Sequence, residues 1–176
     1  MRKIVIIGPE STGKSSLARS LAEHYHTGWV KEYAREFLLT HGKAYTYEDL
    51  YTIACGQIAL EFKTTEAFSE KPLLFIDTDL HVVRVWSEFV FNRCDNRILQ
   101  HIARQSYDLY LLCNTDLPWE ADELREYPDL ESRQRLFHYY YDTLVQQSVP
   151  FEIISGTETT RLQMAIHAVQ KHCLSI

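Results

Sequence analysis

Residues 3–21 read KIVIIGPESTGKSSLARSL, and this stretch decides the fold. Ile4–Ile7 is a short, apolar, β-branched run, which is typical of a strand buried on both faces of a sheet. The next eight residues, Gly8–Ser15, have the pattern G-x-x-x-x-G-K-S, and apolar residues then recur at helical spacing. A glycine-containing loop between a strand and a helix is the context of a phosphate-binding P-loop, whereas a chance match would lack these flanks.

The residue types of this loop suit a polyphosphate. Its two glycines let the backbone curl so that successive N–H groups point at phosphate oxygens, and the start of the following helix adds unpaired N–H groups. Lys14 supplies a positive charge, and the hydroxyl of Ser15 is a hard oxygen ligand for Mg²⁺. We therefore expect a nucleoside triphosphate to bind through Gly8, Glu10, Ser11, Thr12, Gly13, Lys14, Ser15 and Ser16.

Bulk composition narrows the class of protein. A chain of 176 residues is long enough for one domain, residues 1–176, with its own core. The net charge of −6 argues against a nucleic-acid surface, which needs clustered Lys and Arg. The four cysteines show no C-x-x-C spacing, which favours free thiols. The first strand begins next to Met1 and no apolar run reaches about 18 residues, so we expect a cytoplasmic protein without a membrane span.

Short apolar runs alternate with segments of helical periodicity along the whole chain. The expected strands are Ile4–Ile7, Trp29–Val30, Leu73–Ile76, Leu109–Cys113 and Phe151–Ile154. This alternation predicts an α/β fold, a three-layer P-loop kinase sandwich with a five-stranded parallel sheet. By analogy with that class, we expect the strand order 2-3-1-4-5.

Carboxylates follow two of the expected strands. Asp77 ends the third strand, where it would hold Mg²⁺ through water, unless it caps the next helix as Thr78 or Asp79 could. Glu32 ends the second strand, where it would orient or deprotonate an acceptor hydroxyl, unless it only adds first-turn helix charge. Arg35 could pair with Glu32 or contact phosphate, and Asp79 could hold ribose hydroxyls.

The polar, proline-broken segment 114–133 has the features of a lid. Arg125 and Arg133 could close over the triphosphate and neutralise developing charge, although exposed arginines are usually only solvated. Four aromatic residues could stack a flat ring or simply pack in the core, namely Trp29, Tyr33, Tyr47 and Trp119. The Asn114–Asp116 text lacks the lysine of the guanine-reading N-K-x-D motif, which argues against a GTPase switch.

Together these motifs resemble the nicotinamide riboside kinase domain of the NadR family. The resembling text is GPESTGKSSLARSLAEHY (8–25), KEYAREF (31–37), Gly56–Gln57 with Glu61, LFIDTD (74–79), YDLYLLCNTDLPWEADELRE (107–126) and RQRLF (133–137). The resemblance implies transfer of the γ-phosphate of ATP to the 5′-hydroxyl of nicotinamide riboside, giving nicotinamide mononucleotide.

The same resemblance implies roles for individual residues. The P-loop would bind ATP, Asp77 and Glu32 would serve the metal and the acceptor hydroxyl, and Asp79 would hold the ribose. The expected catalytic residues are Lys14, Asp77, Glu32, Arg125 and Arg133, and the expected substrate-binding residues are Trp29, Glu32, Tyr33, Arg35, Asp77, Asp79 and Trp119. The expected partner is a small nucleoside, with no nucleic acid or membrane.

Two alternatives stay open at this point. One is a kinase for another nucleoside-like acceptor on the same scaffold. The other is a regulatory module that binds ATP and transfers nothing.

Overall fold

The computed structural model describes residues 1–174, apart from the side chain of Glu158. Within these residues one parallel sheet has five strands in the order β2-β3-β1-β4-β5, which confirms the predicted order. The strands are β1 (Arg2–Ile7), β2 (Trp29–Val30), β3 (Leu73–Asp77), β4 (Leu109–Cys113) and β5 (Phe151–Ile154).

The central strand β1 shows why these runs form a sheet. All four residues of Ile4–Ile7 are fully buried, and β1 pairs with β3 on one side and with β4 on the other. Successive side chains point to opposite faces, so Ile4 and Ile6 join one core cluster while Val5 and Ile7 join another. Apolar residues at every position are needed because both faces are covered.

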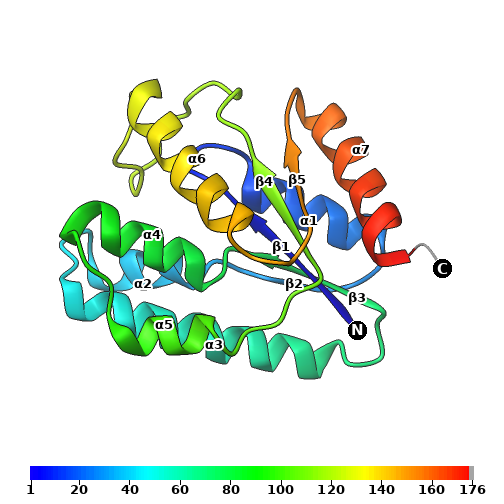
Figure 1. The fold of residues 1–176 in the computed structure, drawn as a ribbon, viewed down its shortest axis with the longest axis horizontal. Helices are drawn as coiled ribbons and strands as arrows, with labels where there is room; N and C mark the ends of the chain where they lie inside the picture. The colour runs from blue at the N-terminus through cyan, green and yellow to red at the C-terminus, as the bar shows by residue number, and fades with distance from the viewer. Residues whose placement is uncertain (175–176) are drawn as a thin grey trace.

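Helices cover both faces of the sheet and make three layers (Figure 1). The helices are α1 (Lys14–His24), α2 (Tyr33–His41), α3 (Tyr47–Ala67), α4 (Leu80–Phe91), α5 (Asn96–Ile102), α6 (Leu130–Val145) and α7 (Glu158–Val169), followed by a π-helical turn, η1 (Gln170–Leu174). Helices α1 and α7 pack on one face of the sheet, and α4 and α6 pack on the other. A third cluster joins α2, α3, α4 and α5.

Local capping sets the helix starts. Thr46 and Asp49 form a capping box at the start of α3, in which each side chain bonds the other residue's backbone N–H. Asp79, Asp95 and Asp129 each accept a backbone N–H at the start of α4, α5 and α6. These side chains bind backbone N–H groups that have no partner within the helix.

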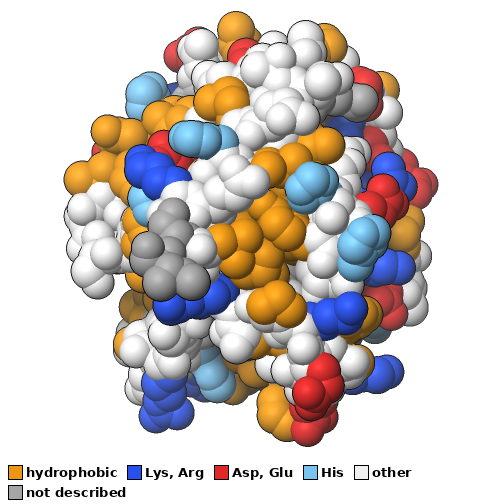
Figure 2. Space-filling view, turned by 90° about the vertical axis from the view of Figure 1, so that its right-hand side faces the viewer, with side chains coloured by type: hydrophobic (Ala, Val, Ile, Leu, Met, Phe, Trp, Pro, Cys, Tyr) orange, Lys and Arg blue, Asp and Glu red, His pale blue; other side chains and the backbone are white. Residues whose placement is uncertain are grey.

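Figure 2 views the molecule from the side that carries α7 in Figure 1. Hydrophobic side chains gather near the centre of this face, and basic and acidic side chains are dispersed around them. The exposed large hydrophobic residues of the chain include Met164 in α7 and Leu174 in η1.

None of the helices in residues 1–174 has both the length and the apolarity needed to cross a membrane. Within the same residues, all four cysteines are free thiols, as the spacing predicted.

Candidate active site

A cavity of about 390 Å³ lies beyond the carboxyl ends of β1 and β2, where open α/β sheets bind ligands. Its walls come from the P-loop, the start of α2, one side of α4, the middle of α6 and the lid segment, which we define as residues 114–129 between β4 and α6. The predicted site residues that line it are Gly8, Glu10, Ser11, Thr12, Gly13, Lys14, Ser15, Ser16, Glu32, Arg35 and Arg125.

The two P-loop glycines serve different needs. A Cβ atom on Gly8 would lie 2.7 Å from the carbonyl oxygen of Cys113, so the loop can start this close to β4 only with glycine. Gly13 has a φ of +75° and is the N-cap of α1, which has no side-chain cap in the described part of the chain. The first amides of α1 are therefore free to bind an anion in the cavity.

Two side chains hold the P-loop in its curled shape. The ammonium of Lys14 donates to the carbonyl of Pro9 at 2.8 Å, and the hydroxyl of Thr12 donates to the same carbonyl at 2.7 Å. The lysine ammonium is thus held against the P-loop backbone, and Lys14 lines the cavity.

Asp77 is the last residue of β3 and is almost fully buried. Burial, and after it the negative charge of Glu32, raises the pKa of Asp77 to about 7, although the charge of Lys14 and a hydrogen bond from Ser15 act in the opposite direction. A strongly shifted carboxyl beside a P-loop is a mark of a functional site.

The surroundings of Asp77 fit a magnesium ion. Its Oδ1 atom is buried and has no hydrogen-bond partner among residues 1–174. Such an atom costs free energy that a cation would recover, and the nearby hydroxyl of Ser15 adds a second hard oxygen. The described residues contain no group of three or more His, Cys, Asp or Glu that could hold a metal alone, so a bound ion would also need substrate oxygens.

Glu32 occupies the N-cap position of α2, yet its side chain makes no capping hydrogen bond there in the described structure. A residue placed only to cap the helix would accept an amide of the first turn. Its carboxylate lines the cavity instead, which favours the acceptor-side role over the helix-charge role.

Gln57 in α3 fixes the backbone on both sides of Glu32. Its Oε1 accepts the N–H of Tyr33 at 2.8 Å, and its Nε2 donates to the carbonyls of Lys31 and Thr78, both at 3.3 Å. Thr78 follows the last residue of β3 and has a left-handed φ of +67°. One buried amide therefore joins the two turns that carry the acidic residues of the site.

The absence of a side chain at Gly56 allows the ring of Tyr33 to pack against α3. A Cβ atom on Gly56 would lie 2.0 Å from Cε1 of the Tyr33 ring, so the ring can pack on α3 only because this position is glycine. Tyr33 thereby joins the cluster between α2 and α3 and does not line the cavity. The structure does not bring Tyr33 into position to stack on a ligand ring.

The lid segment is tied to the P-loop by side chains of the loop itself. The carboxylate of Glu10 accepts the N–H groups of Glu126, at 3.1 Å, and of Tyr127. The hydroxyl of Ser11 accepts from the guanidinium of Arg125 at 3.2 Å. Burial raises the pKa of Glu10, although its two amide bonds act against that rise.

A second tie joins the lid segment to α2. The guanidinium of Arg35 donates two hydrogen bonds, of 3.2 and 2.9 Å, to the carboxylate of Asp122. This pairing lowers the pKa of Asp122. Arg35 therefore pairs with the lid segment rather than with Glu32, which was one of the two contacts that the sequence suggested.

Of the two predicted lid arginines, Arg125 lines the cavity and Arg133 does not. Arg133 is buried, its Nη1 donates to the carbonyl of Leu117 at 3.4 Å, and its Nε has no partner in the described residues. The guanidinium groups of Arg125 and Arg133 lie 5.8 and 5.7 Å from the centre of the Trp119 ring. Trp119 thus lies near both arginines, and it does not line the cavity.

Trp29 and Asp79 also lie outside the cavity wall. Trp29 packs against the core cluster of α1 and α7, which favours the core alternative for this residue. Asp79 accepts the N–H of His81 at 3.0 Å and the hydroxyl of Tyr110 at 2.8 Å. Because these bonds use its carboxylate within the protein, the structure favours the helix-cap alternative over contact with ribose.

Sequence reasoning missed the aromatic wall of the cavity. Trp86 and Phe89 of α4, Tyr127 of the lid segment and Tyr140 of α6 line it. Val82, Trp86 and Phe89 share one face of a helix at spacings of four and three, and that pattern also fits an ordinary core helix. Only the packing of α4 against the site separates the two interpretations.

Comparisons with known proteins place this geometry among its relatives. A family model described as an AAA domain matches residues 3–161. The chain is 28% identical over 156 residues to the trifunctional NAD biosynthesis/regulator protein NadR of Salmonella typhimurium, and equally to that of Escherichia coli. These matches confirm the resemblance to the NadR family. A solved NadR protein in complex with NR superposes with a TM-score of 0.83 at 23% identity, over 99% of this chain and 50% of that one.

A thymidylate kinase from Ehrlichia chaffeensis has the same fold, with a TM-score of 0.69 at 14% identity over 96% of this chain and 98% of that one. The chain covers 86% of its own length in the matches to the curated NadR proteins but spans only 37% of theirs. The match over residues 3–161 shows that this chain belongs to the AAA domain family.

Proposed function

We propose that the chain is an ATP-dependent kinase that phosphorylates the 5′-hydroxyl of nicotinamide riboside and gives nicotinamide mononucleotide. The observation that carries the proposal is that the P-loop and Glu32 line one cavity, while the carboxyl of buried Asp77 is close enough to Glu32, Lys14 and Ser15 to feel all three. Solved NadR proteins contain NR in one structure and NAD with AMP-PNP in another, which supports both substrates.

The phosphates of ATP bind at the P-loop. The free amides at the start of α1 and the ammonium of Lys14 provide the donors and the positive charge that a triphosphate needs. Ser15 and Asp77 are the residues that would hold Mg²⁺, which when bound offsets the charge on the phosphate oxygens.

The acceptor binds on the side of Glu32 and the aromatic wall. A nicotinamide ring attached to ribose is cationic, and the faces of Trp86 and Phe89 attract cations. Lys31, which precedes Glu32, is exposed and does not line the cavity, so its charge is turned away from such a ring.

In the reaction the acceptor oxygen forms a bond to the γ-phosphorus, and the bond from that phosphorus to the bridging oxygen of ADP breaks. Glu32 orients the attacking hydroxyl and accepts its proton. Arg125 lies where it can neutralise charge on the transferred group, and the lid segment keeps water away from it.

The test is product analysis with a panel of acceptors. Purified protein with ATP and Mg²⁺ is incubated with nicotinamide riboside, common nucleosides and deoxynucleosides, and the products are identified by mass spectrometry. The proposal is supported if nicotinamide riboside, and no other acceptor in the panel, is converted to a phosphate monoester. Preferential phosphorylation of another nucleoside supports the second candidate, a kinase for a different acceptor. The fold shared with deoxyadenosine kinase is the observation that favours this candidate.

A third outcome separates the regulatory alternative. If the protein binds ATP but phosphorylates no member of the panel, a module that senses nucleotide without transfer is favoured. We propose a small-molecule ligand in every case, because the net charge of −6 disfavours a nucleic-acid partner.

A further inference from the structure

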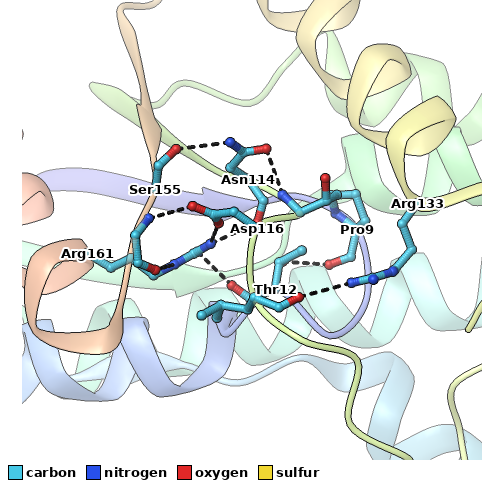
Figure 3. Close-up of polar contacts among 10 residues, drawn as sticks. Pro9, Thr12, Asn114, Asp116, Arg133, Ser155 and Arg161 are labelled. Atoms are coloured by element: carbon cyan, nitrogen blue, oxygen red, sulfur yellow. Dashed lines mark hydrogen bonds and ion pairs between the residues drawn. The ribbon is translucent and has the colours of Figure 1, made fainter. Parts of the chain in front are cut away.

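Arg161, in the first turns of α7, is buried although it carries a charge. Its guanidinium donates to three backbone carbonyls at 2.9 Å each, those of Thr12, Asn114 and Gly156, and it pairs with the carboxylate of Asp116 (Figure 3). The side chain therefore joins the P-loop to the loops that follow β4 and β5.

The bond to the P-loop has a geometric consequence. The peptide unit between Thr12 and Gly13 is planar, and its C=O and N–H groups point in opposite directions. Arg161 does not line the cavity, whereas Gly13 does. The Thr12 carbonyl is turned toward Arg161, so the N–H of Gly13 is turned the other way, toward the cavity.

The hydrogen bond from Arg161 fixes the direction of the Thr12 carbonyl. A flip of the peptide changes φ of the second residue, and glycine adopts either sign of φ at little cost. Gly13 has a φ of +75° in this structure. A flipped peptide would present a carbonyl oxygen to the phosphates, where an amide donor is needed.

We infer that Arg161 is a positioning residue, which sets the Thr12–Gly13 peptide so that it donates its N–H to the bound polyphosphate. The inference rests on the proposed function, because it deepens the phosphate side of that site. Asp116 supports it: one carboxylate oxygen pairs with Arg161, and the other accepts the N–H of Gly156 at 2.5 Å. The guanidinium is thereby fixed in the plane that reaches Thr12.

The test compares nucleotide binding in Arg161→Lys, Arg161→Ala and the control Arg104→Lys, which alters an exposed arginine elsewhere. Binding of AMP-PNP with Mg²⁺ is measured by calorimetry, and KM is measured for ATP and for nicotinamide riboside. A lysine keeps the charge but lacks the planar fork, so we expect Arg161→Lys to weaken AMP-PNP binding by about tenfold or more. The KM for ATP rises with it, while the KM for the acceptor stays within about twofold and Arg104→Lys matches the wild type.

Chemical rescue separates positioning from a merely structural role. If Arg161→Ala folds, added guanidinium at millimolar concentration is expected to restore part of its AMP-PNP affinity, and ethylammonium is not. If it does not fold, the result for Arg161→Lys decides. Unchanged AMP-PNP affinity in folded Arg161→Lys overturns the inference, and so does an equal rise in both KM values.

The proposed function can fail separately. If the wild type binds AMP-PNP but phosphorylates no nucleoside, the kinase proposal is contradicted. The inference on Arg161 is then tested by the AMP-PNP affinities of the variants alone. A wild type that binds neither AMP-PNP nor inorganic tripolyphosphate overturns both.

Discussion

The negative charge of Glu32 acts on the buried carboxyl of Asp77, across the ends of the neighbouring strands β2 and β3. Together with burial, which has the larger effect, it raises the pKa of Asp77 to about 7. Holding these two acidic groups close together costs free energy in the unliganded protein. Binding of a cation, or of its complex with phosphate, offsets that cost.

This relationship predicts how stability depends on pH. Folded Asp77 keeps its proton up to about pH 7, whereas the unfolded residue loses it near pH 4. The folded state therefore binds more protons between these values, and the free energy of unfolding falls as pH rises from about 4 to 7. Asp77→Asn removes this loss and is expected to be more stable than the wild type at about pH 8, by on the order of 2 kcal/mol.

Urea unfolding without nucleotide and with a chelator present measures this difference, and it is expected to shrink toward pH 4. Asp142→Asn, which alters an exposed carboxylate on α6, is the matched control and is expected to leave the pH profile unchanged. An Asp77→Asn variant that is less stable than the wild type at pH 8 would show that the carboxyl is well solvated.

Lys14 is expected to contribute more to catalysis than to the stability of the fold. Lys14→Met removes the charge that faces the phosphates, so kcat/KM is expected to fall by about 100-fold or more. Within the described residues the ammonium donates to the carbonyl of Pro9 alone, so the free energy of unfolding is expected to change by about 1 kcal/mol or less. Lys63→Met on the exposed side of α3 is the control. Loss of the fold in Lys14→Met would contradict this separation.

Gly56 and Tyr33 are expected to be coupled. Gly56→Ala places a Cβ atom 2.0 Å from Cε1 of the Tyr33 ring and is expected to destabilise the protein by about 1–3 kcal/mol. In a Tyr33→Ala background the ring is gone, and the same change is expected to stabilise the middle of α3 by up to about 1 kcal/mol, since alanine is the better helix former. Denaturant unfolding of the four proteins measures the sign change, and the absence of a sign change rules out the steric account.

Glu10 is expected to control leakage of water into the site. Its carboxylate holds two amides of the lid segment, and a neutral amide oxygen accepts such bonds less strongly. In Glu10→Gln we expect a looser lid, with acceptor-independent hydrolysis of ATP raised several-fold relative to transfer. The ratio of ADP to phosphorylated product measures this, with Glu70→Gln as an exposed control. If the ratio in Glu10→Gln stays at the wild-type value, the contact between Glu10 and the lid segment does not contribute to excluding water.

The sheet and the P-loop could be predicted because their signals are local. Ile4–Ile7 is apolar at every position, and the glycine spacing after it has a mechanical reason at each position. Helix ends leave weaker signals in the sequence, and α7 gives way to a π-helical turn after Val169. The strand order came from analogy with the class, since pairing between distant strands leaves no mark in the spacing of residues.

The site was predicted in part for the same reason. Glu32 and Asp77 could be chosen as candidates because Asp77 ends a strand and Glu32 follows one closely, and strand ends meet at one edge of a parallel sheet. The aromatic residues were misplaced because Trp29 and Trp86 look alike in sequence and differ only in what their elements pack against. Gln57 and Arg161 could not be assigned roles, since a single polar residue in a helix has no pattern until the helix is docked.

The most direct measurement of the central claim is the balance between ATP consumed and product formed. Protein with ATP, Mg²⁺ and nicotinamide riboside is followed by liquid chromatography, which resolves ADP and nicotinamide mononucleotide in one run. The account predicts equal amounts of both products and almost no ADP when the acceptor is left out. ADP formation that does not depend on nicotinamide riboside, with no nicotinamide mononucleotide, would contradict it.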